Sequence, residues 1–138
     1  MTTSARIGHS TVFKIGNGAT PEVFTTVAEV TSITPPGMTR DAIDATHSES
    51  PDGWREFIGG LKDGGEVEIA MNYVPGSATT ILLMQEIAAA VGNKQIVFPA
   101  GEIFSFAALC TGISPETPVD GKMEASVTYK VTGRPTLA

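Results

Sequence analysis

The sequence predicts a mainly β fold: an antiparallel β-sandwich or small barrel with one packed α-helix and a long acidic loop. Residues 66–73 and 123–132 alternate apolar and polar side chains with a period of two, which is typical of half-buried strands. A helical pattern occurs only once, between strand patterns, whereas parallel βαβ units would need more helices. The 138 residues fit a single domain, 1–138, that buries a core without disulfides.

Less regular apolar segments supply the other strands. Residues 11–15 and 23–33 flank the turn Gly16-Asn17-Gly18, which predicts an N-terminal pair of strands. A short strand over 94–98 stops at Pro99, and a longer one covers 103–113. One face of this longer strand carries Phe104, Phe106, Ala108 and Cys110, and the other carries Ile103, Ala107, Leu109 and Ile113. Because a strand apolar on both faces is central or covered by another subunit, the second face is a candidate subunit interface, at Ile103, Leu109 and Ile113.

One helix is predicted over 78–91. Ser77 is a suitable N-cap, and Gly92-Asn93 is a suitable stop. At 100° per residue one broad apolar face forms, and we expect it to be buried against the sheet. This face contains Ile81, Leu83, Met84, Ile87, Ala88 and Val91, while Gln85 and Glu86 lie opposite.

The segment 38–62 has no sustained period and is predicted to be a long loop. It is rich in Asp, Ser, Glu and Gly, yet it carries the only tryptophan, Trp54, together with Phe57 and Ile58. A loop of this length inside a domain is usually functional or disordered, and these apolar side chains argue against permanent disorder. A loop that becomes ordered against a partner fits both properties, although a solvated loop that keeps the protein soluble is the alternative.

Charge and cysteine content exclude several classes of protein. The formal net charge of −6 is located entirely within residues 41–68, so a DNA-gripping or anionic-membrane-binding protein is excluded. The single cysteine, Cys110, lies in an apolar run and is expected to be buried and inert. No secretory signal or stretch long enough to insert into a membrane is present, which predicts synthesis in a reducing cytoplasm.

Catalytic, cofactor and metal sites are not expected. Asp44, His47 and Glu49 are the only suggestion of a metal site, but they match no established ligand spacing. Ser48 and Cys110 lie in no nucleophile motif, and no phosphate-binding glycine pattern is present. A hydrolase with a metal in this loop therefore stays only as a third alternative.

Several short motifs follow one another along the chain. Thr34-Pro35-Pro36-Gly37 precedes the acidic loop, and Asp63-Gly64-Gly65 opens the strand that ends at Asn72-Tyr73-Val74-Pro75-Gly76. After the helix come Gln95-Ile96-Val97-Phe98-Pro99 and the ending Val131-Thr132-Gly133-Arg134-Pro135. Over residues 6–136 this order resembles the tail tube proteins of lambda-type phages, which have long, non-contractile tails.

The resemblance implies a structural virion protein and not an enzyme. Subunits of this family form hexameric rings that stack into a tail tube around a tape-measure protein, with a terminator and tip proteins at the ends. DNA passes through the lumen without specific binding, and the subunits are made in the cytoplasm of the bacterial host. Some members of this family carry an immunoglobulin-like domain after the Gly-Arg-Pro ending, and because this sequence stops at Ala138 no such domain is expected here.

By its position, the loop 38–62 corresponds to the family's assembly loop, which contacts neighbouring subunits or rings. The candidate contact residues in it are Met38, Asp41, Asp44, Trp54, Phe57, Ile58 and Lys62. Two alternatives stay open: a β-sandwich binding module, such as a virion decoration or carbohydrate-binding protein, and a type VI-like secretion tube protein, because fold alone does not separate these systems.

Overall fold

The computed structural model describes residue 3 and residues 8–138. In these residues the chain forms nine strands, one α-helix and one short 3-10 helix. Their order is β1 (Val12–Gly16), β2 (Phe24–Thr26), β3 (Val30–Thr34), β4 (Thr39–Asp44), η1 (Pro51–Gly53), β5 (Phe57–Asp63), β6 (Glu66–Asn72), α1 (Ala78–Glu86), β7 (Gly92–Val97), β8 (Ile103–Glu116) and β9 (Glu124–Leu137).

Seven strands form one antiparallel sheet in the order β2-β1-β7-β8-β9-β6-β3, and β4 and β5 form a separate pair. The register pairs Val67 with Tyr129 and Ile69 with Val127, so the alternating strands predicted from the sequence share one buried face. The prediction of a single strand over 23–33 was wrong. This segment divides into β2 and β3, which lie at opposite edges of the sheet.

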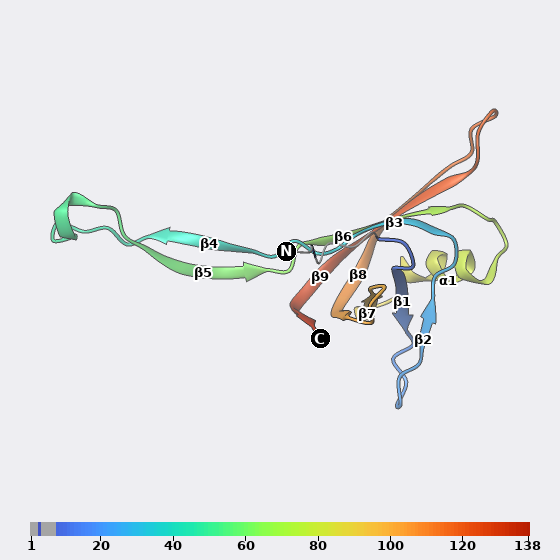
Figure 1. Ribbon diagram of the computed structural model, residues 1–138, viewed down its shortest axis with the longest axis horizontal. Helices are drawn as coiled ribbons and strands as arrows, with labels where there is room; N and C mark the ends of the chain where they lie inside the picture. The colour runs from blue at the N-terminus through green and yellow to red at the C-terminus, as the bar shows by residue number, and fades with distance from the viewer. Residues whose placement is uncertain (1–2, 4–7) are drawn as a thin grey trace.

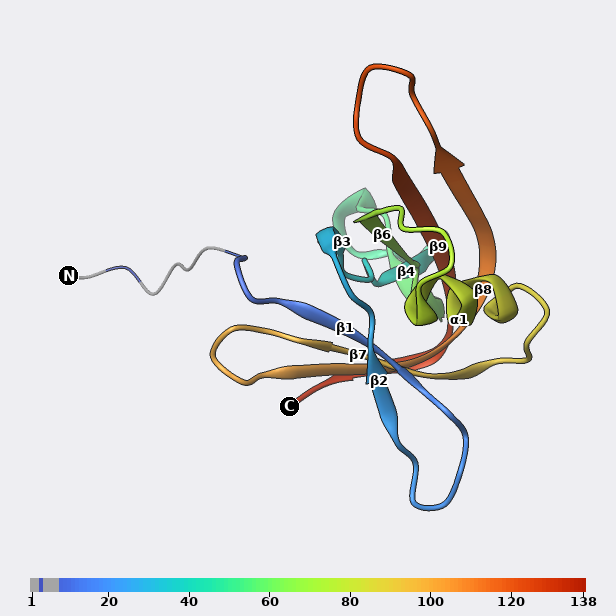
Figure 2. The same cartoon turned by 90° about the vertical axis from the view of Figure 1, so that its right-hand side faces the viewer.

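The sheet curls around its own core. Phe13 of β1 and Tyr129 of β9 lie three strand positions apart, which in a flat sheet corresponds to about 14 Å. Their ring centroids are nevertheless only 5.4 Å apart. Figure 2 shows the strong twist and α1 lying against the sheet. The predicted class, mainly antiparallel β with one packed helix, is confirmed, and the single curled sheet is closer to a barrel than to a sandwich of two sheets.

The helix begins where the sequence predicts, because Ser77 caps it by accepting a hydrogen bond from the backbone N–H of Thr80 at 3.2 Å. It ends at Glu86, five residues before the predicted end. The predicted orientation was only partly correct. Leu83 is buried as predicted, but Glu86, predicted to lie on the other side, is also buried, whereas Ile81 and Met84 are about half exposed. Glu86 is buried against Lys94 of β7, and the helical periodicity contains no sign of that contact.

Tyr129 places an unpaired polar group in the core. Its side chain is fully buried, and its hydroxyl has no hydrogen-bond partner among the described residues. Burial, followed by the nearby Glu86 charge, raises the pKa of this phenol well above its ordinary value near 10. The folded protein therefore keeps the Tyr129 proton at a pH where the unfolded chain releases it, so stability is lost as pH rises above about 10.

We expect Tyr129→Phe to increase the free energy of unfolding at pH 7 by about 1 kcal/mol, since an unpaired buried hydroxyl is removed without opening a cavity. The variant should also lose less stability than the wild type between pH 10 and 11. Urea unfolding at these pH values measures both effects. Tyr73→Phe, which changes the other tyrosine, is the matched control, and an equal change in both variants would contradict the assignment to Tyr129.

Candidate assembly surfaces

Strands β4 and β5 form a long hairpin that projects from the body of the molecule (Figure 1). We call residues 38–63 the arm. Ile43 lies opposite Ile58, and Asp44 lies opposite Phe57. The prediction of an irregular loop was therefore wrong for most of this segment. Both faces of the arm are exposed to solvent, so no burial pattern with a period of two exists in the sequence to reveal the strands.

The arm exposes an unusual amount of apolar surface. Trp54 is 75% exposed, and Phe57 and Ile58 are each more than half exposed. All seven assembly residues predicted in this segment are exposed, namely Met38, Asp41, Asp44, Trp54, Phe57, Ile58 and Lys62. Sequence reasoning missed Ile43 and Leu61, which are equally apolar and exposed. Apolar side chains gathered on a projecting element are typical of an interaction surface.

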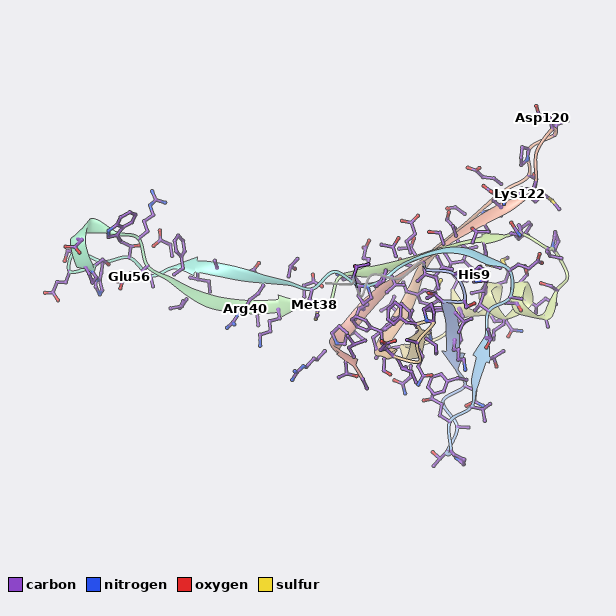
Figure 3. The ribbon with its side chains drawn as sticks, in the orientation of Figure 1. His9, Met38, Arg40, Glu56, Asp120 and Lys122 are labelled. Carbon is purple, nitrogen blue, oxygen red and sulfur yellow. The ribbon has the colours of Figure 1, made fainter. Side chains whose placement is uncertain are left out.

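Short hydrogen bonds hold the tip of the arm in one conformation. Ser50 Oγ donates to Glu56 Oε2 at 2.7 Å and accepts from the backbone N–H of His47 at 3.0 Å. The backbone N–H of Thr46 donates to Asp44 Oδ1 at 2.9 Å, and hydrogen bonds from Thr46 lower the pKa of Asp44. These hydrogen bonds order the tip that carries Trp54. Figure 3 shows Glu56 near the tip of the arm, far from Met38 at its base.

The same contacts bear on the suggested metal site. Asp44 is engaged by Thr46, and His47 lies beside Ser50 and Glu56. The described residues contain no group of three or more His, Cys, Asp or Glu side chains that could hold a metal ion. Asp44, His47 and Glu49 are thus not brought together as a ligand set. Within the same part of the chain, no helix is long and apolar enough to cross a membrane.

An ion pair and a tight turn fix the base of the arm to the sheet. Lys130 Nζ of β9 lies 2.9 Å from Asp63 Oδ1, which also accepts the backbone N–H of Gly65 at 2.8 Å. The Gly65 hydrogen bond and then Lys130 lower the pKa of Asp63. Gly65 has φ = +77° and lies against the carbonyl group of Gly37, so a Cβ at this position would collide with backbone. These contacts join the base of the arm to β9 and to the segment before β4.

Strand β8 is central in the sheet. The prediction that Ile103, Leu109 and Ile113 share its outer face is only partly correct. Leu109 is exposed and lies opposite Lys130, which lies opposite Glu66 on the far side of β9. Ile103 is half-buried. Ile113 instead packs against the core, because the register shift between Cys110 and Gly112 moves it to the other face of the strand.

A second exposed apolar surface lies on α1 and the turn that follows it. Met84 is 55% exposed, and Ile81, Ile87 and Val91 are exposed to a similar extent. We call these four residues the helix face. The sequence indicates their apolar character, but it assigns them to the core. In the structure α1 instead buries Thr80, Leu83 and Glu86, and Glu86 lies against Lys94 of β7.

The sequence matches the family described as "Lambda phage tail tube protein, TTP" over residues 6–138. The chain belongs to this family. It is a structural subunit of a tail tube, it is not an enzyme, and its location is the tail of the virion. Family membership selects the tail tube over the alternatives of a binding module, a metal hydrolase and a type VI-like tube.

Solved structures share the fold of this tail tube protein. A chain from the tail of an empty GTA particle with C6 symmetry has a TM-score of 0.78 and 20% identity, with 97% of this chain and 99% of that chain covered. A chain from the virion of a native gene transfer agent particle has a TM-score of 0.76 and 19% identity, at the same coverage. A chain from the PVC sheath/tube terminator of an extracellular contractile injection system has a TM-score of 0.74 and 10% identity, covering 100% and 99%. No curated protein sequence matches this chain.

Proposed function

We propose that this tail tube protein forms hexameric rings that stack into a hollow tube, and that the arm joins each subunit to a neighbouring copy. The arm carries the proposal: an ordered hairpin that stands away from the body and exposes Trp54, Phe57 and Ile58 is unfavourable for an isolated subunit. The C6 symmetry of the tail with a similar fold supports six copies in a ring. Rings closed by rotation need two different surfaces on each subunit.

The acidic residues of the arm have a separate role in this proposal. Asp41, Asp44 and Glu56 are exposed beside the apolar side chains and keep the unassembled arm hydrated. Within a ring, the outer face of β8 contributes a second contact through Ile103 and Leu109. Ile113 supports this strand from the core side and does not reach the neighbour.

The tube lumen would hold the tape-measure protein before it conducts double-stranded DNA, with terminator and tip proteins at its ends. The net charge of −6 and the low basic content support passage of DNA without specific binding, because phosphate contacts would retard movement. The similar fold of a chain from a sheath/tube terminator supports an end cap built on related subunits.

Trp54→Ala tests the role of the arm. Loss of an anchoring aromatic residue at an interface typically costs about 2 kcal/mol or more, so the concentration needed for tube formation should increase by about thirty-fold. Negative-stain microscopy of tubes over a protein concentration series measures it, and circular dichroism confirms the fold. Tubes of unchanged yield and length would refute the role of Trp54. Val119→Ala, at an exposed apolar residue on the β8–β9 hairpin, is the matched control.

A further inference from the structure

The helix face, Ile81, Met84, Ile87 and Val91, is a surface without charge. Glu86 is the only charged residue between positions 77 and 93, and it is buried against Lys94. Leu83, next to Met84 in the sequence, is buried in the core. A helix whose apolar surface extends beyond the side chains it buries is typical of an element that is covered by a second partner, and this partner is absent from the isolated subunit.

We propose that the helix face is the receptor for the arm tip of the next copy, with Trp54, Phe57 and Ile58 packing on Met84 and its neighbours. This inference rests on the proposed function, in which the arm docks on another copy, and it names the surface that receives it. Trp54 presents a large flat apolar group. Methionine adapts its shape to such groups and makes favourable sulfur–aromatic contacts, which suits Met84 as the centre of the receptor.

The positions of the two surfaces favour a second copy as the occupant. The arm extends from one end of the molecule along its longest axis, and α1 lies at the other end (Figure 1). The arm tip therefore cannot fold back onto the helix of its own chain. Two different complementary surfaces on one chain form a heterologous contact, which is the kind that generates closed rings and extended stacks.

Charge and polarity disfavour the other candidate surfaces. The arm is acidic, and an approach to the outer sheet face would bring it to Glu66 and Glu68, both exposed. The β8–β9 hairpin carries Asp120 near its tip (Figure 3). The helix face presents no exposed acid to the arm.

A groove beside β3 is the remaining competitor. It has a volume of about 720 Å³ and runs between residues 8–11, 30–33 and 98–99. Its lining includes Ser10, Thr11, Thr31 and Ser32, so burying indole and phenyl rings there would leave hydroxyl groups without water. The helix face is apolar throughout and has no such cost.

Photo-crosslinking in assembled tubes tests the receptor. We replace Trp54 with the aromatic photo-crosslinker p-benzoylphenylalanine, irradiate the tubes, and identify the crosslinked peptides by mass spectrometry. The expected result is a covalent dimer in which position 54 is joined to the segment 81–91 of another copy. A dimer joined only elsewhere, such as at 30–33, overturns this inference and leaves the proposed docking of the arm intact. Tubes that give no crosslinked dimer overturn both.

A charge substitution provides a second measurement. Met84→Glu should reduce tube yield at least about tenfold, because it places an acid where an acidic arm docks. Since Met84 faces solvent, the subunit should stay folded, which circular dichroism checks. Val119→Glu adds the same charge at an exposed apolar residue of another hairpin and should keep tube formation. Wild-type tube yield from folded Met84→Glu would overturn the inference.

Discussion

Replacing Lys94 with methionine should lower the free energy of unfolding by about 3–5 kcal/mol, because Glu86 then stays buried with no cation beside it. Lys94 is 1% exposed, and its Nζ lies 3.5 Å from Glu86 Oε1 of α1 and 5.5 Å from the centre of the Tyr129 ring. A single domain is typically stable by about 5–15 kcal/mol, so the loss is a large part of the total. Urea unfolding followed by circular dichroism measures it.

The structure offers a matched control for Lys94→Met. Lys122 Nζ and Glu124 Oε1 are 3.4 Å apart, almost the same distance, but both side chains are more than half exposed. Lys122→Met should change the free energy of unfolding by less than about 1 kcal/mol, since water screens an exposed pair. If both variants unfold at the same urea concentration, burial does not give the Lys94 pair its importance.

The double variant Lys94→Met with Glu86→Leu distinguishes loss of the ion pair from burial of an unpaired Glu86 charge. An apolar pair of similar size should recover most of the stability lost in Lys94→Met, because no uncompensated charge remains buried. The orientation of α1 is then held by apolar packing alone. Hydrogen exchange of the α1 amides reports whether the helix is still fixed to β7, and faster exchange at unchanged global stability would assign the pair an orienting role.

Where buried and exposed residues alternate along a strand, the sequence alone predicts the position of that strand. β6 and β9 show a period of two because one face of each packs on the core. Their predicted N-terminal ends agree with the structure to within one residue, whereas β9 extends to Leu137, beyond its predicted end at residue 132. The Ser77 cap located the start of α1 for a similar reason, since capping is a local interaction. These features depend only on neighbouring residues.

Other features depend on contacts between distant residues. The helix face was assigned to the core because the contact between Glu86 and Lys94 joins two different elements and is not visible in the helical periodicity. Ile113 was assigned to the outer face because a bulge changes the alternation within β8. The arm was predicted to matter for assembly from Trp54 and its neighbours, but not to be a hairpin, because a strand exposed on both faces has no preferred pattern. Composition thus indicated a candidate assembly segment, and only the structure supplied its shape.

Gly65, at the base of the arm, is the site of the second substitution with a large expected effect. Gly65→Ala should lower the free energy of unfolding by about 2–3 kcal/mol and also prevent tube formation. The backbone at Gly65 has φ = +77°, which costs a residue with a side chain about 1 kcal/mol. The added methyl group would also collide with the carbonyl group of Gly37, in the segment between β3 and β4 that leads into the arm. Relief of this collision must displace Gly37 or Gly65, and both displacements redirect the arm.

Gly53→Ala separates the two causes. Gly53, at the arm tip, has nearly the same conformation, φ = +73°, but nothing lies within 4 Å of the position that its Cβ would occupy. The free energy of unfolding of Gly53→Ala should therefore decrease only by the cost of the backbone conformation, about 1 kcal/mol, and this variant should still form tubes. Thermal unfolding and negative-stain microscopy compare the variants. If Gly65→Ala and Gly53→Ala lose equal stability and assemble equally, contact with Gly37 does not direct the arm. If Gly65→Ala alone stops assembly at a temperature where it is folded, the direction of the arm is a requirement for the tube, separate from its apolar tip.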